Sequence, residues 1–239
     1  MIKRDYNTLS ACVDAFCSGN DDNNLFSDTA KFLLEAVLVS AFEDEEHRDQ
    51  FLGLIDKLQT ACDPFPGLLA RITSDIGYKC YQLKSAALAE WVYRYALALT
   101  ESTGTQNNLA YILRRHRETL CSSHTEIIDL LIDGVRRQEP CSLMNMALHC
   151  ALNLGTPDDW HLADRLIKLI ADDDIASVYQ WWGDLAASED PEGILVLYWL
   201  NRHNKLPIPM DQACSPWIQQ IKDHYSNIPD WLFASAAEN

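Results

Sequence analysis

The chain of 239 residues is 48% hydrophobic and 23% charged, which indicates a globular protein and excludes a disordered one. Its formal net charge is −16, so nucleic acid and anionic membranes are disfavoured as partners, because both require basic residues opposite their phosphates. Nine glycines and nine prolines are few for the many tight turns of an all-β fold, and this favours helices.

No apolar run approaches the roughly 20 residues that span a bilayer, and Met1 to Asp5 are not followed by the apolar core of a signal peptide. We therefore expect a cytoplasmic protein without a membrane partner. The eight cysteines fall mostly within apolar helical stretches, which predicts reduced, buried thiols rather than disulfides.

Apolar residues recur at helical spacing along nearly the whole chain, and no stretch sustains the period of two that a half-buried strand requires. Residues 1–66 contain predicted N-terminal helices, which two prolines end. Further helices are predicted over 67–82, 85–100, 107–117, 125–138, 142–154, 159–171, 175–187 and 192–203. After two more prolines, residues 204–239 are expected to form capping helices that begin at Ser215 and near Asp230. Short connections predict antiparallel neighbours within a single domain, residues 1–239.

Small residues recur where two helices would have to approach closely. In the predicted first helix of each pair these are Gly77, Ala110, Ala147 and Gly183, which lie 33, 37 and 36 residues apart. The second helices carry a small or apolar residue and, four positions later, a large one: Ala89 and Tyr93, Ile127 and Leu131, Ala163 and Ile167, Gly193 and Leu197. This pattern resembles the tetratricopeptide repeat (TPR), a helix pair of about 34 residues, over residues 70–203. It is degenerate, because only the first pair keeps the spacing of the family and Ile127 stands where the family prefers a small residue.

The resemblance implies an all-α fold in which antiparallel helix pairs stack as an α–α superhelix or solenoid. It also implies a protein that holds a protein or peptide partner in a groove lined by the first helices, as an adaptor, a chaperone or a regulatory subunit. An enzyme and a cofactor are not expected. The alternative fold is a helical bundle with accidental periodicity.

The register of the repeat places six residues on or near this groove: Tyr78, Tyr81, Asn107, Tyr111, Arg114 and Arg115. Tyrosine offers a large contact area at low entropic cost, and arginine offers two parallel donors to a carboxylate. Residues 71–140, with eight acids and nine bases, are the one segment of the chain that is not acidic. We therefore predict an acidic or C-terminal peptide as the ligand. The structural alternative is that arginines near a helix C-terminus complement the helix dipole and the tyrosines belong to the core.

Two other functions stay open from the sequence. The acidic flanks, Glu43 to Glu46 and Asp172 to Asp174, would suit an immunity or inhibitor protein that neutralises a cationic toxin or enzyme. The third possibility is a helical enzyme with an unrecognised site.

The residue types of catalysis and metal binding do not form a recognisable set. Ser122, Ser123 and His124 lack the glycines of a nucleophile elbow and are interpreted as the start of a helix. Two carboxylate-x2-His pairs occur at residues 44–47 and 158–161, without the glutamates of a di-iron bundle, so no metal site is predicted. Trp181 and Trp182 are adjacent on a predicted helix, so only one of them can point fully into the core.

Overall fold

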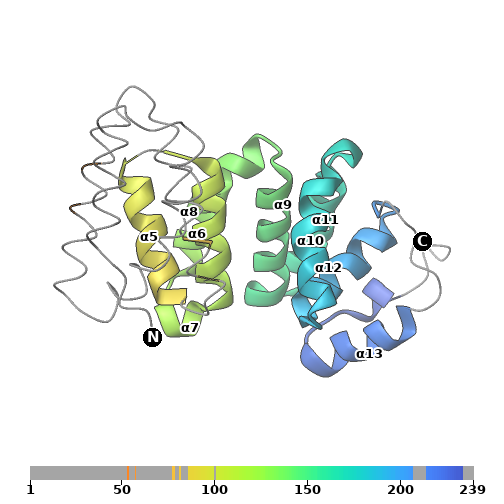
Figure 1. Ribbon diagram of the computed structural model, residues 1–239. Coiled ribbons are helices and arrows are strands. Elements are labelled where there is room, and N and C mark those ends of the chain that lie inside the picture. Colours follow the sequence, from red (N-terminus) through yellow and green to blue (C-terminus); the bar gives the residue numbers. More distant parts are fainter. Residues whose placement is uncertain are drawn as a thin grey trace. The chain divides into compact units, whose positions relative to one another are not determined.

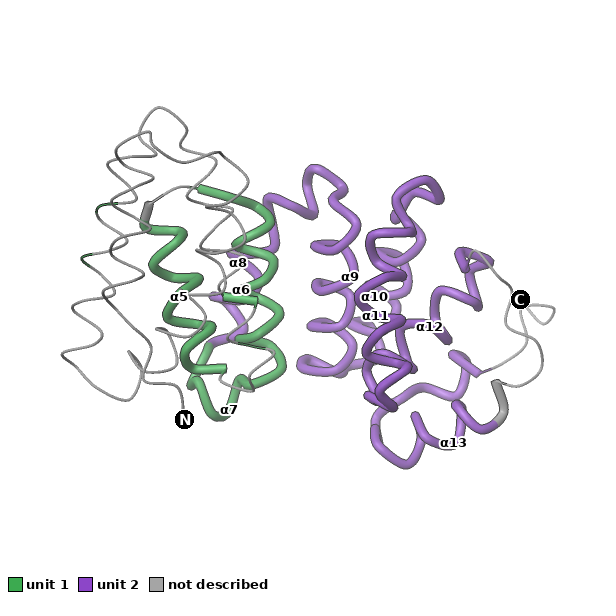
Figure 2. Tube along the Cα trace, in the orientation of Figure 1, with its two compact units in different colours: residues 1–122 green, residues 123–239 purple. Residues whose placement is uncertain are grey.

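A computed structural model of the protein describes residues 86–99, 101–206 and 214–233, together with Gly53, Lys57, Gly77, Tyr78 and Tyr81. Within these residues every regular element is a helix and no strand occurs, which confirms the predicted all-α class (Figure 1). Most of the helices expected in residues 1–82 lie outside the described residues. The chain divides into two compact units, residues 1–122 and residues 123–239 (Figure 2). This boundary falls inside the segment that resembles the repeat.

The described part of unit 1 contains three helices, α5 (Ala86–Leu99), α6 (Thr103–Arg115) and the short α7 (Arg117–Leu120). Unit 2 contains α8 (His124–Arg136), α9 (Pro140–Leu148), the π-helix η1 (His149–Leu154), α10 (Pro157–Leu169), the 3-10 turn η2 (Asp172–Asp174), α11 (Ile175–Ala187), α12 (Pro191–Arg202), α13 (Cys214–His224) and the 3-10 turn η3 (Asp230–Phe233).

The predicted boundaries agree best where an apolar residue opens the helix, as at α11, which spans residues 175–187 in both. The helix predicted from residue 107 begins instead at Thr103, because Ser102 accepts a hydrogen bond from the Thr105 backbone and caps a first turn that has no apolar pattern. The helix predicted over 142–154 begins at Pro140, and its second half is the π-helix η1 rather than α-helix.

Polar side chains and prolines fix the other helix starts. The Ser123 side chain accepts from the backbone of Glu126 at 3.1 Å, which confirms that this serine pair opens a helix. Thr156 and Asp159 form a reciprocal capping box at the start of α10, and Pro157 occupies the first turn. At the start of α12, the Asp190 side chain accepts hydrogen bonds from the backbone of Glu192 and Gly193, and Pro191 occupies the first turn.

In unit 1, α5 packs against α6, and glycine allows a close contact at α5. A Cβ atom added to Gly77 would lie 2.6 Å from the ring of Tyr93, so only glycine fits beside this buried tyrosine. Both residues belong to the first window of the repeat pattern. Ala89 and Ala96 of α5 and Ala110 of α6 are also buried.

In unit 2, α9 contacts α8, α10 and α11, and α12 contacts α11 and α13. A Cβ atom added to Gly193 would lie 2.5 Å from the backbone nitrogen of Ala186, so α11 and α12 approach at this glycine as closely as two backbones allow. Gly183 differs, because a Cβ atom there would meet only Tyr179 of the same helix, at 3.9 Å. The fourth window of the pattern therefore has one glycine that the helix contact requires and one that it does not.

Three tryptophans, Trp160, Trp182 and Trp199, fill the core of unit 2. Trp181 is only half-buried, which confirms that one member of the adjacent pair points inward.

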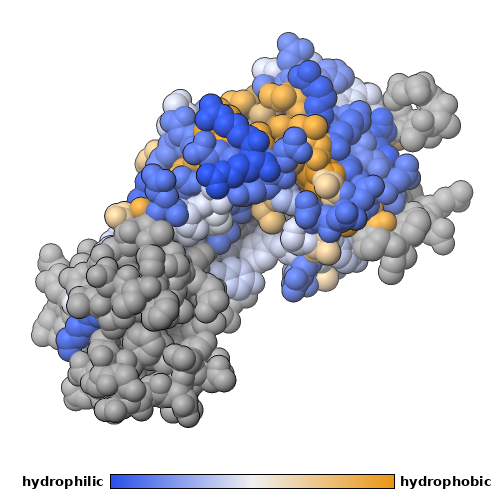
Figure 3. Space-filling view, turned by 90° about the horizontal axis from the view of Figure 1, so that it is seen from above, coloured by the Kyte–Doolittle hydropathy of each residue, from blue (hydrophilic) through white to orange (hydrophobic). Residues whose placement is uncertain are grey.

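In the described part of the chain, no helix is both long and apolar enough to cross a bilayer. Figure 3 shows apolar residues gathered on one face of this part and bordered by hydrophilic ones.

Candidate functional site

Four of the six residues predicted to bind a partner meet in unit 1. The hydroxyl oxygens of Tyr81 and Tyr111 lie 3.4 Å apart, and their rings meet edge to face with centroids 5.5 Å apart. Arg115 donates from Nη1 to the Tyr111 hydroxyl at 2.8 Å. The guanidinium carbons of Arg114 and Arg115 both lie 5.7 Å from the centroid of the Tyr111 ring, within the range of a cation–π contact. We call these four residues the tyrosine–arginine cluster.

The members of the cluster differ in exposure. Tyr111 is 5% exposed and Arg114 is 3% exposed, so both are core residues that fix the geometry. Tyr81 and Arg115 are half-buried and form the accessible edge. A partner would therefore meet the Tyr81 hydroxyl and the Arg115 guanidinium, with Tyr111 and Arg114 behind them.

Helix α6 aligns these side chains. Tyr111 and Arg115 are four residues apart, which brings them onto one side of the helix, and both arginines lie in its last turn, where the helix dipole favours positive charge. His116 caps the end of α6, and its ring meets the ring of Tyr81 edge to face at 5.8 Å. His116 was not predicted from the sequence, although its place directly after two arginines at a helix end was a usable signal.

The other two predicted residues, Tyr78 and Asn107, are half-buried in the same unit. The contacts of the cluster described above do not include them. Their part in partner binding stays a prediction.

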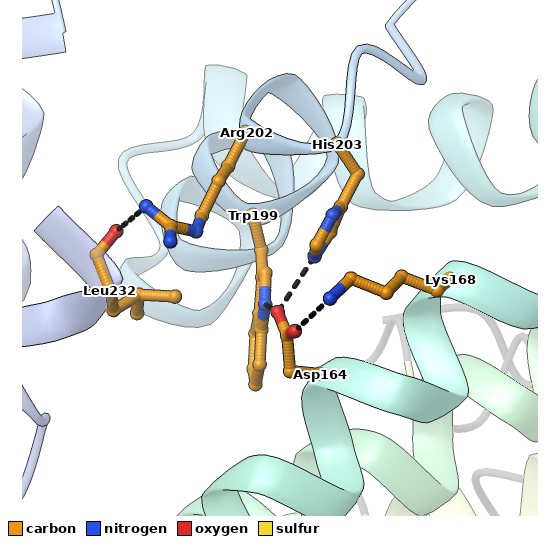
Figure 4. Close-up of polar contacts among 6 residues, drawn as sticks. All are labelled: Asp164, Lys168, Trp199, Arg202, His203 and Leu232. Atoms are coloured by element: carbon orange, nitrogen blue, oxygen red, sulfur yellow. Dashed lines mark hydrogen bonds and ion pairs between the residues drawn. The ribbon is translucent and has the colours of Figure 1, made fainter. Parts of the chain in front are cut away.

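Unit 2 contains a second polar cluster, centred on the buried carboxylate of Asp164 in α10 (Figure 4). Its Oδ1 atom accepts hydrogen bonds from Trp199 Nε1 at 2.9 Å and from His203 Nε2 at 2.7 Å. Its Oδ2 atom pairs with Lys168 Nζ at 2.9 Å. Because Trp199 and His203 come from α12 and its C-cap, this Asp164 cluster joins α10 to α12.

Two opposing effects act on the pKa of Asp164. Burial raises it, and the hydrogen bonds from His203, Lys168 and Trp199 lower it; together the hydrogen bonds prevail and hold this pKa well below its ordinary value. The carboxylate is therefore ionised at neutral pH. All its donors come from the chain itself, so it acts as a brace between helices rather than as a free base.

Asp164 was not among the site residues predicted from the sequence, although its position in the helix carried a signal. Asp164 lies four residues after Trp160 and three before Ile167, on the side of the helix that these apolar residues bury. A charged residue at such a position requires partners, because an unpaired buried charge is costly. Only the fold shows that those partners lie 35 and 39 residues later in the chain.

Two histidines connect α8 to the π-helix. The ring nitrogens His124 Nδ1 and His149 Nε2 lie 3.4 Å apart, and His149 is fully buried. The imidazole of His149 is thus part of the packing between these elements. No three metal-ligating side chains converge within the described residues, and His161 of the carboxylate-x2-His pair stacks on Trp231 with ring centroids 5.1 Å apart.

Three cysteines of the described part carry free thiols. Burial, and then the charge of Asp159, raise the pKa of Cys150 to about 11, and burial also raises the pKa of Cys141. Both thiols stay protonated at neutral pH and pack as small apolar groups. Cys121 contradicts the expectation of burial, because it is exposed at the C-cap of α7 with a positive φ of 53°.

No protein family, no curated protein and no solved structure matches this chain.

Proposed function

We propose that this chain is a protein-binding module of the adaptor, chaperone or regulatory type, built from stacked TPR-like helix pairs. Two features support the repeat. Glycines of the pattern stand where added Cβ atoms would clash with Tyr93 and with the backbone of Ala186. Helix α9 packs both on α10, its own pair, and on α11, the first helix of the next pair, as stacked repeats do.

The observation that carries the proposed function is the accessible edge of the tyrosine–arginine cluster. The Arg115 guanidinium is fixed by its 2.8 Å hydrogen bond to Tyr111, and the Tyr81 hydroxyl lies 3.4 Å from the same oxygen. A guanidinium has five N–H donors, and that of Arg115 lies at the half-buried edge of the cluster. An ionised oxygen acid, above all a carboxylate, is the group that such a set of donors recognises best. We propose as ligand a peptide segment with a C-terminal or side-chain carboxylate.

A library of displayed peptides with free C-termini tests this proposal. We expect the full chain to select peptides that carry a carboxylate, and the Arg115→Gln variant to bind the selected peptides about 10- to 100-fold more weakly, because hydrogen bonds to charged groups are the stronger ones. Arg94→Gln is the matched control in the same unit, since Arg94 pairs with Glu90 on the surface of α5. Equal binding of the selected peptides after amidation of their C-termini and acidic side chains would contradict the proposed function.

The alternative function is an inhibitor of a cationic protein. Unit 2 carries eighteen acidic and seven basic side chains, a net charge of −11, and the three residues of η2 are exposed acids. Asp172 already pairs with Lys205 Nζ at 3.1 Å, so Asp173 and Asp174 would be the first to meet a basic surface. A basic protein that binds the chain at low salt and leaves at high salt would favour this function.

A further inference from the structure

Helix α10 presents an apolar surface that its own unit does not bury. Leu162 is 38% exposed and Leu169 is 52% exposed. They are seven residues apart, so they lie on the same side of α10, about 10 Å apart along its axis. Arg165 stands between them, three residues after Leu162 and four before Leu169. We call these three residues the α10 outer face.

The opposite side of α10 serves the interior of unit 2. Trp160, Ala163 and Ile167 are buried in the core, and Asp164 and Lys168 belong to the Asp164 cluster. Leu162 and Leu169 thus contribute nothing comparable to the packing, although each exposes apolar area to water. Apolar residues seven apart on a helix are the anchors by which amphipathic helices meet a partner.

Arg165 gives this surface a charge of its own. It is exposed and makes no hydrogen bond or ion pair anywhere in the described residues, whereas Lys168 on the same helix pairs with Asp164. It stands in a unit whose net charge is −11. A positive charge between two exposed leucines is therefore available to a carboxylate of a partner.

An aromatic ring adjoins the N-terminal end of the α10 outer face. Trp231 of η3 stacks on His161, the residue before Leu162, with an angle of 7° between the rings. The Arg202 guanidinium lies 5.8 Å from the centroid of the Trp231 ring, and the same arginine donates to the Leu232 carbonyl. Trp231 is half-buried, so part of its ring stays accessible. Tryptophan and arginine are the residue types that most often dominate a protein interface.

We propose that the α10 outer face binds an amphipathic helix of a protein partner. The partner helix would place two apolar residues, seven positions apart, against Leu162 and Leu169, and an acidic side chain between them opposite Arg165. A second copy of this chain does not meet this requirement. In a twofold contact the face would meet itself, and Arg165, at the middle of the face, would lie against the Arg165 of the second copy. The acidic charge of unit 2 likewise disfavours an anionic membrane.

A matched pair of synthetic peptides tests the proposal. Both are fluorescent amphipathic helices of about 20 residues with leucines seven positions apart; one has Glu between the leucines and the other has Lys. By fluorescence anisotropy we expect the full chain to bind the Glu peptide at least about tenfold more tightly than the Lys peptide, because like charges at a contact are strongly unfavourable. The variant Arg165→Glu should reverse this order. That reversal cannot arise from a loss of folding, which would lower the affinity for both peptides alike.

The double variant Leu162→Ser, Leu169→Ser should bind both peptides more weakly. Leu154→Ser is its control, because Leu154 is 37% exposed but does not belong to the face. The proposal would be overturned by equal affinity for the two peptides, by an unchanged order in Arg165→Glu, or by an equal loss in Leu154→Ser. Sedimentation that shows a dimer of the chain, dispersed by Leu169→Glu, would also overturn it, since the occupant would then be a second copy. None of these results bears on the tyrosine–arginine cluster, which lies in the other unit.

Discussion

The two polar clusters of this protein use similar residue types for different ends. In the Asp164 cluster, one buried carboxylate receives donors from three side chains of the same unit. In the tyrosine–arginine cluster, two guanidinium groups lie against one tyrosine ring, and one of them donates a hydrogen bond to the hydroxyl of that tyrosine. The carboxylate at the centre of the first cluster is buried, whereas Arg115 and Tyr81 of the second cluster are only half-buried.

On the proposed function, the Asp164 cluster has a structural role and the tyrosine–arginine cluster has a binding role. A closed cluster has nothing to offer a ligand, and its loss should appear as lost stability. A cluster that binds a partner at a half-buried edge should contribute little to stability and much to binding. Loss of the two clusters should therefore lower the free energy of unfolding by different amounts.

Removal of the central carboxylate should have the largest effect. In Asp164→Ala, the buried indole N–H of Trp199 and the imidazole of His203 lose their acceptor, and Lys168 loses its partner. We expect the free energy of unfolding to fall by about 3–5 kcal/mol, the range for breaking a buried pair. Denaturant titration followed by circular dichroism measures it. Asp184→Ala, at an exposed site of α11, is the control and should stay within about 0.5 kcal/mol.

The contact between α11 and α12 provides the next test, because it depends on shape alone. In Gly193→Ala, the new Cβ atom would lie 2.5 Å from the Ala186 nitrogen and 2.8 Å from the Leu185 carbonyl carbon, and backbone atoms cannot rotate away. We expect the free energy of unfolding to fall by about 1–3 kcal/mol.

Gly183→Ala, ten residues earlier, is the matched control. The added Cβ atom meets no atom closer than 3.9 Å, so the free energy of unfolding should rise by up to about 1 kcal/mol through helix propensity. A loss of stability in both variants would mean that the two glycines do not differ as described.

Acid should weaken the Asp164 cluster in a defined direction. Since the pKa of Asp164 is lowered on folding, the unfolded state binds more protons than the native state around pH 4. The stabilisation is therefore complete above about pH 5 and is lost as the pH falls through the native pKa. With an ordinary pKa of about 3.9, the stability difference between the wild type and Asp164→Ala should shrink by about 1 kcal/mol between pH 7 and pH 3. A difference that grows towards pH 3 would show that the carboxylate is not stabilised in its ionised form.

The sequence predicted the helices of the described part well, because their signals are local. Apolar periodicity and the caps at Ser123 and Thr156 act within a few residues, and α11 was placed at residues 175–187. The start of α6 was missed, since its first turn, Thr103 to Gln106, has no apolar residue to reveal it. The π-helix was missed for a related reason: its residues keep an apolar pattern that α-helix and π-helix share.

The candidate sites divide in the same way. Tyr111, Arg114 and Arg115 lie within one helix, so helical geometry alone brings them together. The Asp164 cluster joins residues from α10 and from α12 and its C-cap, and no local rule relates positions so far apart in the chain. The exposure of Arg115 and the burial of Arg114, adjacent residues of equal charge, also depend on the tertiary packing around them.

Variants of the tyrosine–arginine cluster should change the free energy of unfolding least. They therefore contrast most sharply with Asp164→Ala. Arg115→Gln removes the donor to the Tyr111 hydroxyl at a half-buried site, and on the proposed binding role we expect the free energy of unfolding to fall by about 0.5 kcal/mol or less. Tyr81→Phe removes one hydroxyl and should be equally mild. Both variants should nevertheless weaken the binding of carboxylate peptides, because the lost donors belong to the accessible edge. If Arg115→Gln instead unfolds the protein as severely as Asp164→Ala, the tyrosine–arginine cluster is a brace like its counterpart in unit 2, and the partner must bind elsewhere.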